Sequence, residues 1–186
     1  NFSEPFEIKY LDKDGTQKYA HETSWGTSTR LIGAIIMTHG DERGLKLPPM
    51  IAPYQVVVVP VAAHKEGVLE GAKAVADKLT AAGLRVKFDD RDNVTPGWKF
   101  NEWELKGVPV RVEIGPRDLA EGKVMSVRRD TFEKAPLDIE DLEGEIKAML
   151  DAIQTNMFEI ARAFRDAHTA DVHNMEELGR QVDGGY

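Results

Sequence analysis

The sequence has no cysteine among its 186 residues. Disulfides, iron–sulfur clusters, thiolate zinc sites and a cysteine nucleophile are therefore excluded, and this composition suits a reducing compartment. No apolar run approaches the roughly 20 residues that span a bilayer, and the chain does not open with a basic and then apolar signal segment. We expect no membrane partner, no metal site in these residues and a cytoplasmic location.

An excess of positive charge is also missing, because 24 basic residues stand against 32 acidic ones. The imbalance is local. Residues 1–137 carry 20 charges of each sign, whereas residues 138–186 carry 4 basic and 12 acidic side chains. A globally basic nucleic-acid-binding protein is excluded. A local nucleic-acid-binding face on the neutral part stays open, because phosphate contacts need only a basic patch.

The first 48 residues predict the end of a domain rather than a complete one. Alternating apolar and polar residues predict strands at 6–10 and 18–25, joined by a turn. Ser28 or Thr29 can cap a helix that ends before Gly40. This helix is apolar nearly all round, so we expect it to be buried. A hairpin and one helix cannot form a stable core, so the segment needs further protein to pack against.

The middle of the chain predicts an α/β domain with a mixed or parallel sheet. The proline-rich stretch 46–53 indicates an extended connector. The β-branched run 55–61 that follows is typical of a central strand buried on both faces. Strands then alternate with helices, as in layered α/β proteins. We expect helices at 65–82 and 95–106, with Thr95 as N-cap and Pro96 in the first turn, and strands at 84–88, 109–114 and 123–127.

Residues 137–168 predict one long helix. Apolar residues recur at three- and four-residue spacing from Leu142 to Phe164, and the opposite face is acidic. We expect the acidic face to meet solvent and the apolar face to pack on the body of the protein or on a further domain. The predicted segments of the chain are therefore 1–48, 49–136 and 137–186.

Two groups of residues show a family resemblance. The stretch TSWGTSTRLIGA at 23–34, followed by HGDERGLKLPP at 39–49, resembles motif 3 of class II aminoacyl-tRNA synthetases. The sequence DDRD at 89–92, with TPGWKF at 95–100 and EWELKG at 102–107, resembles the anticodon-binding domain of one such family. That family is the prolyl-tRNA synthetases of the archaeal and eukaryotic-like type. The resemblance covers essentially the whole chain.

The resemblance implies both a fold and an activity. It implies the C-terminal portion of a synthetase, in which residues 1–48 end a class II catalytic domain. Residues 49–136 would form a three-layer anticodon-binding domain with a mixed sheet, and 137–186 an acidic helical linker toward a further C-terminal domain. The intact enzyme would be a homodimer that uses ATP and Mg²⁺ to attach proline to its tRNA. We expect no cofactor bound to this chain alone, and no aminoacylation by it.

The resemblance also assigns roles in the first segment. Arg30 matches the motif 3 arginine that contacts ATP, and it is the one predicted catalytic residue. The strand end that lines the proline and adenylate pocket in the family matches Thr23, Ser24, Trp25 and Gly26. From the residues alone, Arg30 can equally be a structural arginine at a strand–helix corner, and Trp25 can be a core residue.

The predicted RNA-binding residues follow from the chemistry of guanine, which proline anticodons contain twice. The N1–H and N2–H₂ donors of guanine suit a carboxylate, its O6 and N7 acceptors suit an arginine, and a splayed base stacks on an aromatic ring. Phe100 and Glu104 lie four residues apart, on one face of the predicted helix. On the residues alone, Glu104, Lys106 and Arg111 can equally form a solvated charge face. The predicted anticodon-binding residues are Phe100, Glu104, Arg111, Arg117 and Asp118, with Lys99, Lys106, Arg128 and Lys134 as phosphate or rim contacts.

Simpler interpretations stay open for other features. Trp98 and Trp103 are expected to be core anchors, because large aromatic side chains mostly pack. The acidic turn 89–92 is more typical of a charged strand end than of a metal site. For the chain as a whole, the alternatives are a free-standing RNA-binding module derived from a synthetase, and a protein–protein adaptor that uses the acidic helix.

Overall fold

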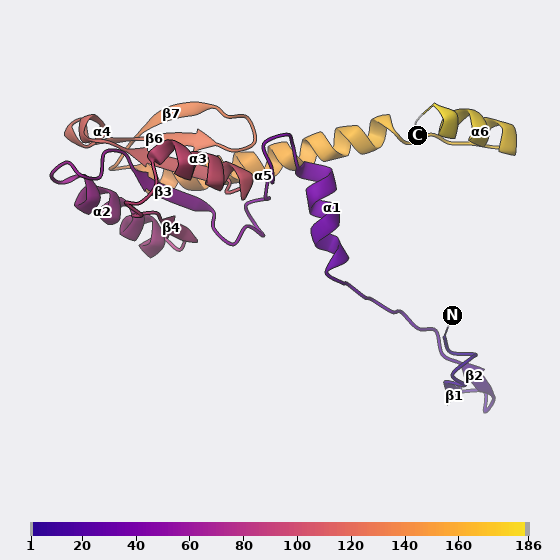
Figure 1. Cartoon of the computed structure of the whole chain (residues 1–186). Coiled ribbons are helices and arrows are strands. Elements are labelled where there is room, and N and C mark those ends of the chain that lie inside the picture. Colours follow the sequence, from indigo (N-terminus) through magenta and orange to yellow (C-terminus); the bar gives the residue numbers. More distant parts are fainter. Residues whose placement is uncertain (1, 185–186) are drawn as a thin grey trace. The chain divides into compact units, whose positions relative to one another are not determined.

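The computed structural model of the protein describes residues 2–184. These residues form two compact units, 2–33 and 34–184, and each is described by itself. Figure 1 labels the helices and strands along the chain. The functional boundaries predicted after residues 48 and 136 remain predictions.

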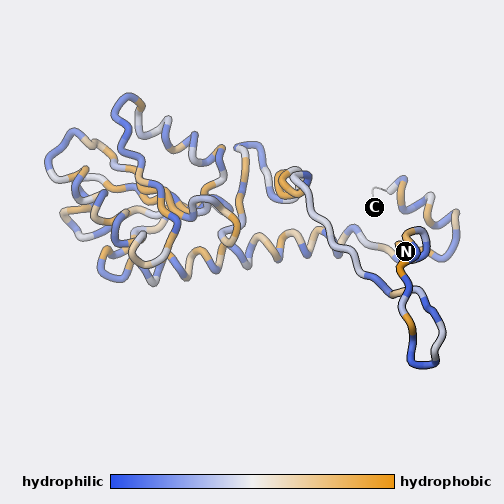
Figure 2. Tube along the Cα trace, turned by 90° about the horizontal axis from the view of Figure 1, so that it is seen from below, coloured by the Kyte–Doolittle hydropathy of each residue, from blue (hydrophilic) through white to orange (hydrophobic). Residues whose placement is uncertain are grey.

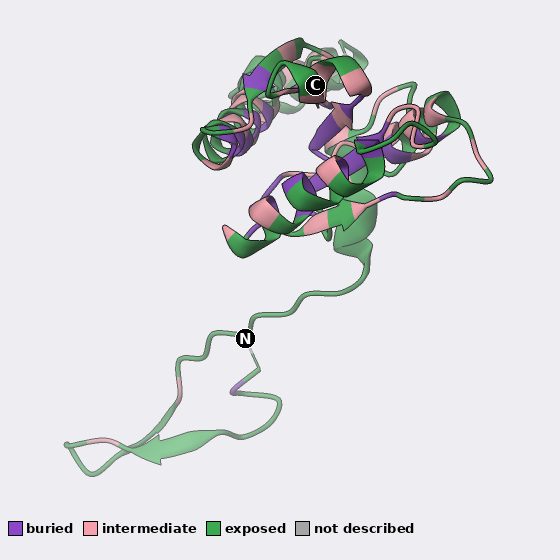
Figure 3. Ribbon diagram, turned by 90° about the vertical axis from the view of Figure 1, so that its left-hand side faces the viewer, coloured by how far each residue is buried: buried purple, intermediate pink, exposed green. Residues whose placement is uncertain are grey.

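The first unit contains one hairpin. Strand β1 (Lys9–Leu11) pairs antiparallel with β2 (Gln17–Tyr19). The turn between them uses Gly15 at φ +78°, and the carboxylate of Asp14 accepts a hydrogen bond from the Thr16 N–H (2.9 Å). The predicted hairpin is confirmed, although its strands are shorter than expected. Every strand residue is exposed, as Figure 3 shows, so the hairpin has no core of its own.

Helix α1 (Arg30–His39) forms where it was predicted. The Ser28 hydroxyl accepts the Arg30 N–H (3.3 Å), and the Gly40 N–H donates to a carbonyl one turn earlier (2.8 Å). The expected burial of this helix is wrong: α1 has no buried residue, and Met37 is 88% exposed. Apolar character indicates what a helix needs to cover, and residues 2–184 leave this one largely uncovered.

The second unit is built on a five-stranded mixed sheet in the order β4-β3-β5-β6-β7. The central strand β3 (Val56–Pro60) is parallel to both neighbours, β4 (Val86–Phe88) and β5 (Val110–Ile114). Beyond β5, β6 (Lys123–Arg128) and β7 (Lys134–Asp138) pair antiparallel. All of β3 is buried, as expected for a valine run in a central strand. The predicted mixed sheet is confirmed.

Helices cover both faces of this sheet, which gives the three predicted layers. Helix α2 (Val68–Ala81) and the first half of α5 (Leu142–Ala167) pack on one face, and α3 (Pro96–Leu105) packs on the other, mainly over β3. Alternate valines of β3 therefore point into two separate cores. Figure 2 shows hydrophobic residues concentrated along these strands.

Sequence analysis did not predict three of the observed elements. The long helix was predicted from residue 137, but β7 occupies 134–138 and α5 begins at Leu142. Pro136 argued against a strand, because proline has no N–H to donate to a neighbouring strand. It is tolerated here because β7 is an edge strand, with a pairing partner on one side only. Short α4 (Pro116–Ala120) forms where only a turn was expected, and α6 (Met175–Asp183) was not predicted. Within residues 2–184, no helix combines the length and apolarity that a membrane span needs.

Candidate functional site

Helix α3 positions the candidate site, and local sequence fixes where it lies. The hydroxyl of Thr95 caps its start by accepting a backbone N–H three residues on (3.3 Å), as predicted. Its end is set by Gly107 at φ +72°. Between these ends, Trp103 buries its ring against valines of the sheet. That anchor fixes the rotation of the helix and turns Phe100 and Glu104 toward β5.

Arg111 of β5 lies between two carboxylates on the same face. Its Nη1 donates to Glu104 Oε1 (2.9 Å) and its Nε donates to Glu113 Oε1 (2.9 Å), while its guanidinium carbon lies 4.3 Å from the ring centre of Phe100. We call Phe100, Glu104, Arg111 and Glu113 the Glu104 cluster. The Arg111 side chain is 8% exposed, against 16% for Glu104 and 13% for Glu113. All three charged side chains are therefore mostly covered. Within residues 2–184 each carboxylate accepts from Arg111 through Oε1 alone, and Oε2 of Glu104 and of Glu113 accepts no described hydrogen bond.

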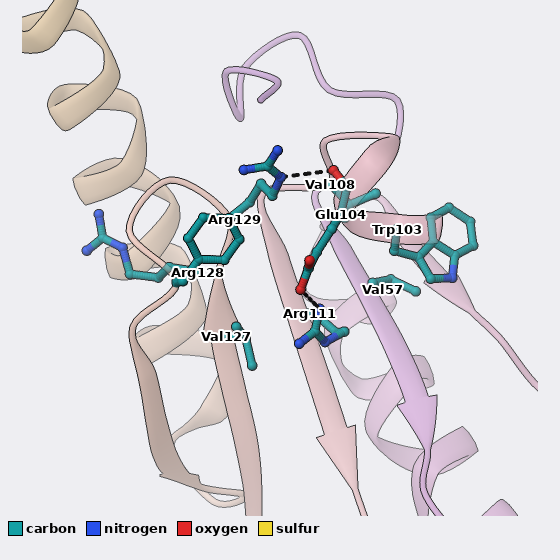
Figure 4. A pocket seen from close by; sticks show the side chains of 9 residues that line it. Val57, Trp103, Glu104, Val108, Arg111, Val127, Arg128 and Arg129 are labelled. Carbon is teal, nitrogen blue, oxygen red and sulfur yellow. Dashed lines mark hydrogen bonds and ion pairs between the residues drawn. The ribbon is translucent and has the colours of Figure 1, made fainter. Parts of the chain in front are cut away.

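Arg129 contacts the main chain of Glu104, a member of the same cluster. Its Nε donates to the Glu104 carbonyl (2.9 Å), and its Nη1 and Nη2 donate to the two carboxylate oxygens of Asp41 (2.9 and 2.7 Å). Figure 4 shows Arg129 and Arg111 reaching Glu104 from two sides. Between them lies a hollow of about 10 Å³, room for roughly one water molecule. Only 4% of Arg129 is exposed, so both of its contacts are part of the packed domain.

Asp41 joins the chain that follows α1 to this site. Besides Arg129, its carboxylate accepts the Arg43 N–H (2.9 Å) and lies 3.2 Å from Lys46 Nζ. The hydrogen bonds from Arg129 hold the pKa of the Asp41 carboxyl well below its usual range, and they outweigh the raising effect of burial. Asp41 therefore stays ionised and keeps this segment tied down.

Phe132 adds a second aromatic ring beside the cluster. Its backbone has φ +61°, a left-handed conformation that a bulky residue rarely adopts and that costs roughly 1–3 kcal/mol. The guanidinium carbons of Arg43 and Arg129 lie 4.5 and 5.1 Å from the centre of its ring. Arg43 Nη1 also lies 3.7 Å from Glu104 Oε2. Strained residues of this kind gather at functional sites, and this one lines the hollow next to Glu104.

Sequence reasoning missed part of this site. Glu113 follows Arg111 by two positions on a strand, so alternation alone places both on one face and offered a usable signal. No local pattern connects Arg129 with Asp41, which lies 88 positions earlier. Phe132 lies in a connection between strands that were not both predicted.

A second charged group lies on another side of α3. Asp89 Oδ1 accepts Arg91 Nε (2.8 Å), and Oδ2 accepts Arg91 Nη2 (2.7 Å) and Trp103 Nε1 (2.8 Å). We call Asp89, Arg91 and Trp103 the Asp89 cluster. Burial raises the pKa of Asp89, but the hydrogen bonds from Arg91 and Trp103 lower it further, and the net result is about 2. This confirms that the acidic turn is a charged strand end.

Two predictions for α3 are wrong. Lys99 was expected to contact phosphate, but it is 2% exposed and its Nζ donates to the Asp89 carbonyl (3.0 Å). Trp98 was expected in the core, but it is 49% exposed and lies under the Arg91 guanidinium (5.2 Å). Trp103 is the buried tryptophan, as predicted. Because Lys99 and Trp103 are one turn apart, they share the inner face of the helix, and Trp98 does not.

Arg117 and Asp118 lie on α4, after the end of β5. The Asp118 carboxylate accepts the Gly115 N–H (2.8 Å) and so caps α4. Arg117 is exposed. Among residues 2–184, no described hydrogen bond or ion pair links either side chain to the Glu104 cluster.

The predicted rim residues differ in how exposed their side chains are and in how closely an acidic residue pairs with them. Arg128 forms a two-pronged contact with Asp130 (3.0 and 2.7 Å) and is mostly covered. Lys106 pairs with a carboxylate one turn earlier (2.6 Å) but is half exposed. Lys134 is 55% exposed and its Nζ lies 3.7 Å from Glu113, beside the cluster.

The predicted catalytic segment is exposed to solvent in this structure. Arg30 is the exposed first residue of α1. The residues expected to line the proline and adenylate pocket lie in exposed chain that forms neither helix nor strand. They are Thr23, Ser24, Trp25 and Gly26. Trp25 is 92% exposed rather than in a core. In the described part of the chain, no group of three or more His, Asp or Glu side chains is placed to hold a metal ion.

The Glu104 cluster is suited to bind an unpaired base. Carboxylate oxygens that the domain leaves without a hydrogen bond can accept from a donor edge, and an aromatic ring offers a stacking surface. Arg43 and Lys134 stand at its margin and provide positive charge for a phosphate backbone.

Residues 55–149, which include both clusters, match the family described as anticodon binding domain. This match covers half of the chain. The chain therefore belongs to the family of anticodon-binding domains.

Two relatives illustrate the closer likeness. The chain is 55% identical over 177 residues to a proline–tRNA ligase of Lachnospira eligens, an alignment that covers 95% of this chain and 37% of the relative. It is 54% identical over 185 residues to a proline–tRNA ligase of Symbiobacterium thermophilum, covering 98% of this chain and 38% of the relative. The chain thus spans little more than a third of the length of these relatives.

Proposed function

We propose that this chain supplies anticodon recognition to a proline–tRNA ligase, and that the Glu104 cluster reads the bases. The observation that carries the proposal is Arg111, which bonds one oxygen of Glu104 and one of Glu113 beside an aromatic ring and leaves the second oxygen of each without a hydrogen bond from the described residues. The likeness to proline–tRNA ligases runs through 95–98% of the chain, the motif 3 stretch included. That extent favours a ligase over a free-standing RNA-binding module.

The recognition chemistry is simple. A guanine splayed from the anticodon loop presents N1–H and N2–H₂, which the Glu104 carboxylate accepts. Its ring stacks on the exposed part of Phe100. Arg111 is already engaged with both carboxylates, so its main task is to hold them apart and oriented.

Arg117 and Asp118 enter the proposal as a separate contact on the anticodon arm. Arg117 is free to meet a phosphate or the O6/N7 edge of the second guanine. Asp118 fixes the turn that presents Arg117, because its carboxylate caps α4. Residues 49–136 act as the anticodon-binding domain in this scheme, and 137–186 as a helical linker.

Residues 1–48 are proposed to be the end of the catalytic domain of the longer enzyme. There Arg30 contacts ATP, and Thr23, Ser24, Trp25 and Gly26 line the pocket for proline and its adenylate. Proline, ATP with Mg²⁺, and assembly as a homodimer belong to that longer protein. By itself the 186-residue chain is expected to show no proline-dependent ATP–pyrophosphate exchange; measurable exchange would contradict this division of labour.

Binding to RNA tests the proposed function. The full chain is titrated with the proline tRNA and with a copy in which both anticodon guanines are cytosines, at one fixed salt concentration. A clear preference for the native anticodon is expected, and Glu104→Ala and Arg111→Ala are expected to erase it. Equal affinity for both RNAs would contradict anticodon recognition by this chain.

A further inference from the structure

The chain that follows α1 forms backbone hydrogen bonds with the end of α3. The Leu45 N–H donates to the Leu105 carbonyl (3.0 Å), and the Leu47 N–H donates to the Gly107 carbonyl (3.1 Å). We call residues 41–47 the docking segment. It therefore lies against the C-terminal end of the helix that presents Glu104, although more than fifty residues separate the two in sequence.

Two glycines show how close this approach is. Gly44 has φ +121°, and a Cβ there would lie 2.6 Å from the Leu105 carbonyl oxygen. Gly107 has φ +72°, and a Cβ there would lie 2.7 Å from Leu45 backbone atoms. No side chain fits at either point, so the segment and the helix end are built for contact.

Asp41 is the hub of the docking segment. One of its oxygens accepts both the Arg43 N–H (2.9 Å) and Arg129 Nη2 (2.7 Å). Arg129 in turn donates a hydrogen bond to the Glu104 carbonyl, and Arg43 Nη1 lies 3.7 Å from Glu104 Oε2. The Glu104 residue is thus held through its main chain and flanked at its side chain by groups that Asp41 organises.

Resting on the proposed function, we infer that Asp41 and Arg129 are positioning residues for anticodon discrimination. They set the placement of the Glu104 carboxylate and couple it to the chain that leaves α1. Neither residue touches RNA in this scheme. Arg129 is buried, and the Asp41 carboxylate is occupied by Arg129, Arg43 and Lys46. Their loss weakens the distinction between right and wrong bases rather than general affinity.

The test compares Asp41→Asn with Glu42→Gln in the full chain. Glu42 is the exposed neighbour, so its substitution makes the same change of charge without touching the hub. The readout is the ratio of affinities for the proline tRNA and for the copy with both guanines replaced by cytosine. Asp41→Asn is expected to lower this ratio between about threefold and thirtyfold, the usual range for coupling through a network. Affinity for the substituted RNA stays unchanged, and Glu42→Gln keeps the wild-type ratio.

The outcomes separate the inference from the proposed function. A wild-type ratio of one overturns the proposed function, and the inference with it. A clear wild-type ratio that Asp41→Asn leaves intact overturns the inference alone, as does an equal loss of affinity for both RNAs, which indicates a merely structural role.

A second variant guards against an unfolded Asp41→Asn protein. Arg43 has a 62% exposed side chain, so Arg43→Gln is expected to fold normally by circular dichroism. It removes the group that flanks the Glu104 carboxylate and is expected to lower the ratio by about threefold. An unchanged ratio in folded Arg43→Gln, beside an unfolded Asp41→Asn, overturns the inference.

Discussion

Two acid–arginine clusters lie against helix α3 and are built in opposite ways. In the Asp89 cluster the carboxylate is buried, with a side chain 1% exposed, and its arginine is 38% exposed. In the Glu104 cluster the order is reversed, since the arginine is 8% exposed and its two carboxylate partners are 16% and 13% exposed. Each arginine lies over an aromatic ring, Arg91 over Trp98 and Arg111 over Phe100. The same residue types thus give two different surfaces.

The difference shows which cluster can take a ligand. Both oxygens of Asp89 are used by donors from the domain itself, so nothing is left for a partner. The carboxylates of Glu104 and Glu113 each keep one oxygen that accepts no hydrogen bond from the described residues. This contrast supports our proposal that the Glu104 cluster recognises RNA, whereas the Asp89 cluster stabilises the fold.

The largest effect is expected from breaking the Asp89 cluster. Asp89→Asn removes the charge that pairs with Arg91 and buried Lys99, and is expected to lower the free energy of unfolding by about 3 kcal/mol. Urea unfolding measures it, with exposed Asp90→Asn as the matched control. A loss no larger than that of the control would show that the cluster is not structural.

Acid tests the same cluster with a somewhat smaller effect. The folded-state pKa of Asp89 is about 2, below the 3.8 of the free side chain. Its contribution is therefore present above pH 3.8 and is lost as the pH falls through 2; a shift of this size corresponds to about 2 kcal/mol. Unfolding free energies from pH 5 to pH 2 should fall more steeply for the wild type than for Asp89→Asn. Parallel curves would contradict the assignment.

The Glu104 cluster is expected to respond in binding rather than in stability. Phe100→Leu keeps an apolar side chain but removes the stacking surface, so affinity for the anticodon stem-loop is expected to fall about tenfold. Fluorescence anisotropy measures it, and Trp98→Leu is the control on the same helix. If both variants lose affinity equally, stacking is not specific to the Glu104 cluster.

The smallest effect is expected at the margin. Lys134→Gln removes one exposed charge beside Glu113, so the slope of log affinity against log salt is expected to fall by about 1. The preference for the native anticodon should not change. A changed preference with an unchanged slope would place Lys134 among the base-reading residues instead.

The sequence predicted the parts of the site that depend on local pattern. Thr95 and Pro96 marked the start of α3, and the four-residue spacing placed Phe100 beside Glu104. The same helical phase would have separated Trp98 from Trp103, but hydrophobicity alone assigned both to the core.

What the sequence did not predict depends on long-range contact. The Arg129–Asp41 link joins segments that have no shared periodicity, and only the folded domain brings them together. Strand β7 was not predicted because proline inside a strand is tolerated mainly at a sheet edge, and an edge is a property of the whole sheet. We expected α1 to be buried because it is apolar, but composition does not show which residues would bury it.

A double-mutant cycle tests the central claim most directly. Wild type, Glu104→Gln and the control Glu102→Gln are each titrated with the proline anticodon stem-loop and with copies in which one guanine or the other is inosine, which lacks the N2 amino donor. We predict that inosine at one position costs the wild type and Glu102→Gln about tenfold in affinity and costs Glu104→Gln almost nothing. Equal costs in all three proteins, at both positions, would contradict the claim that Glu104 reads a guanine.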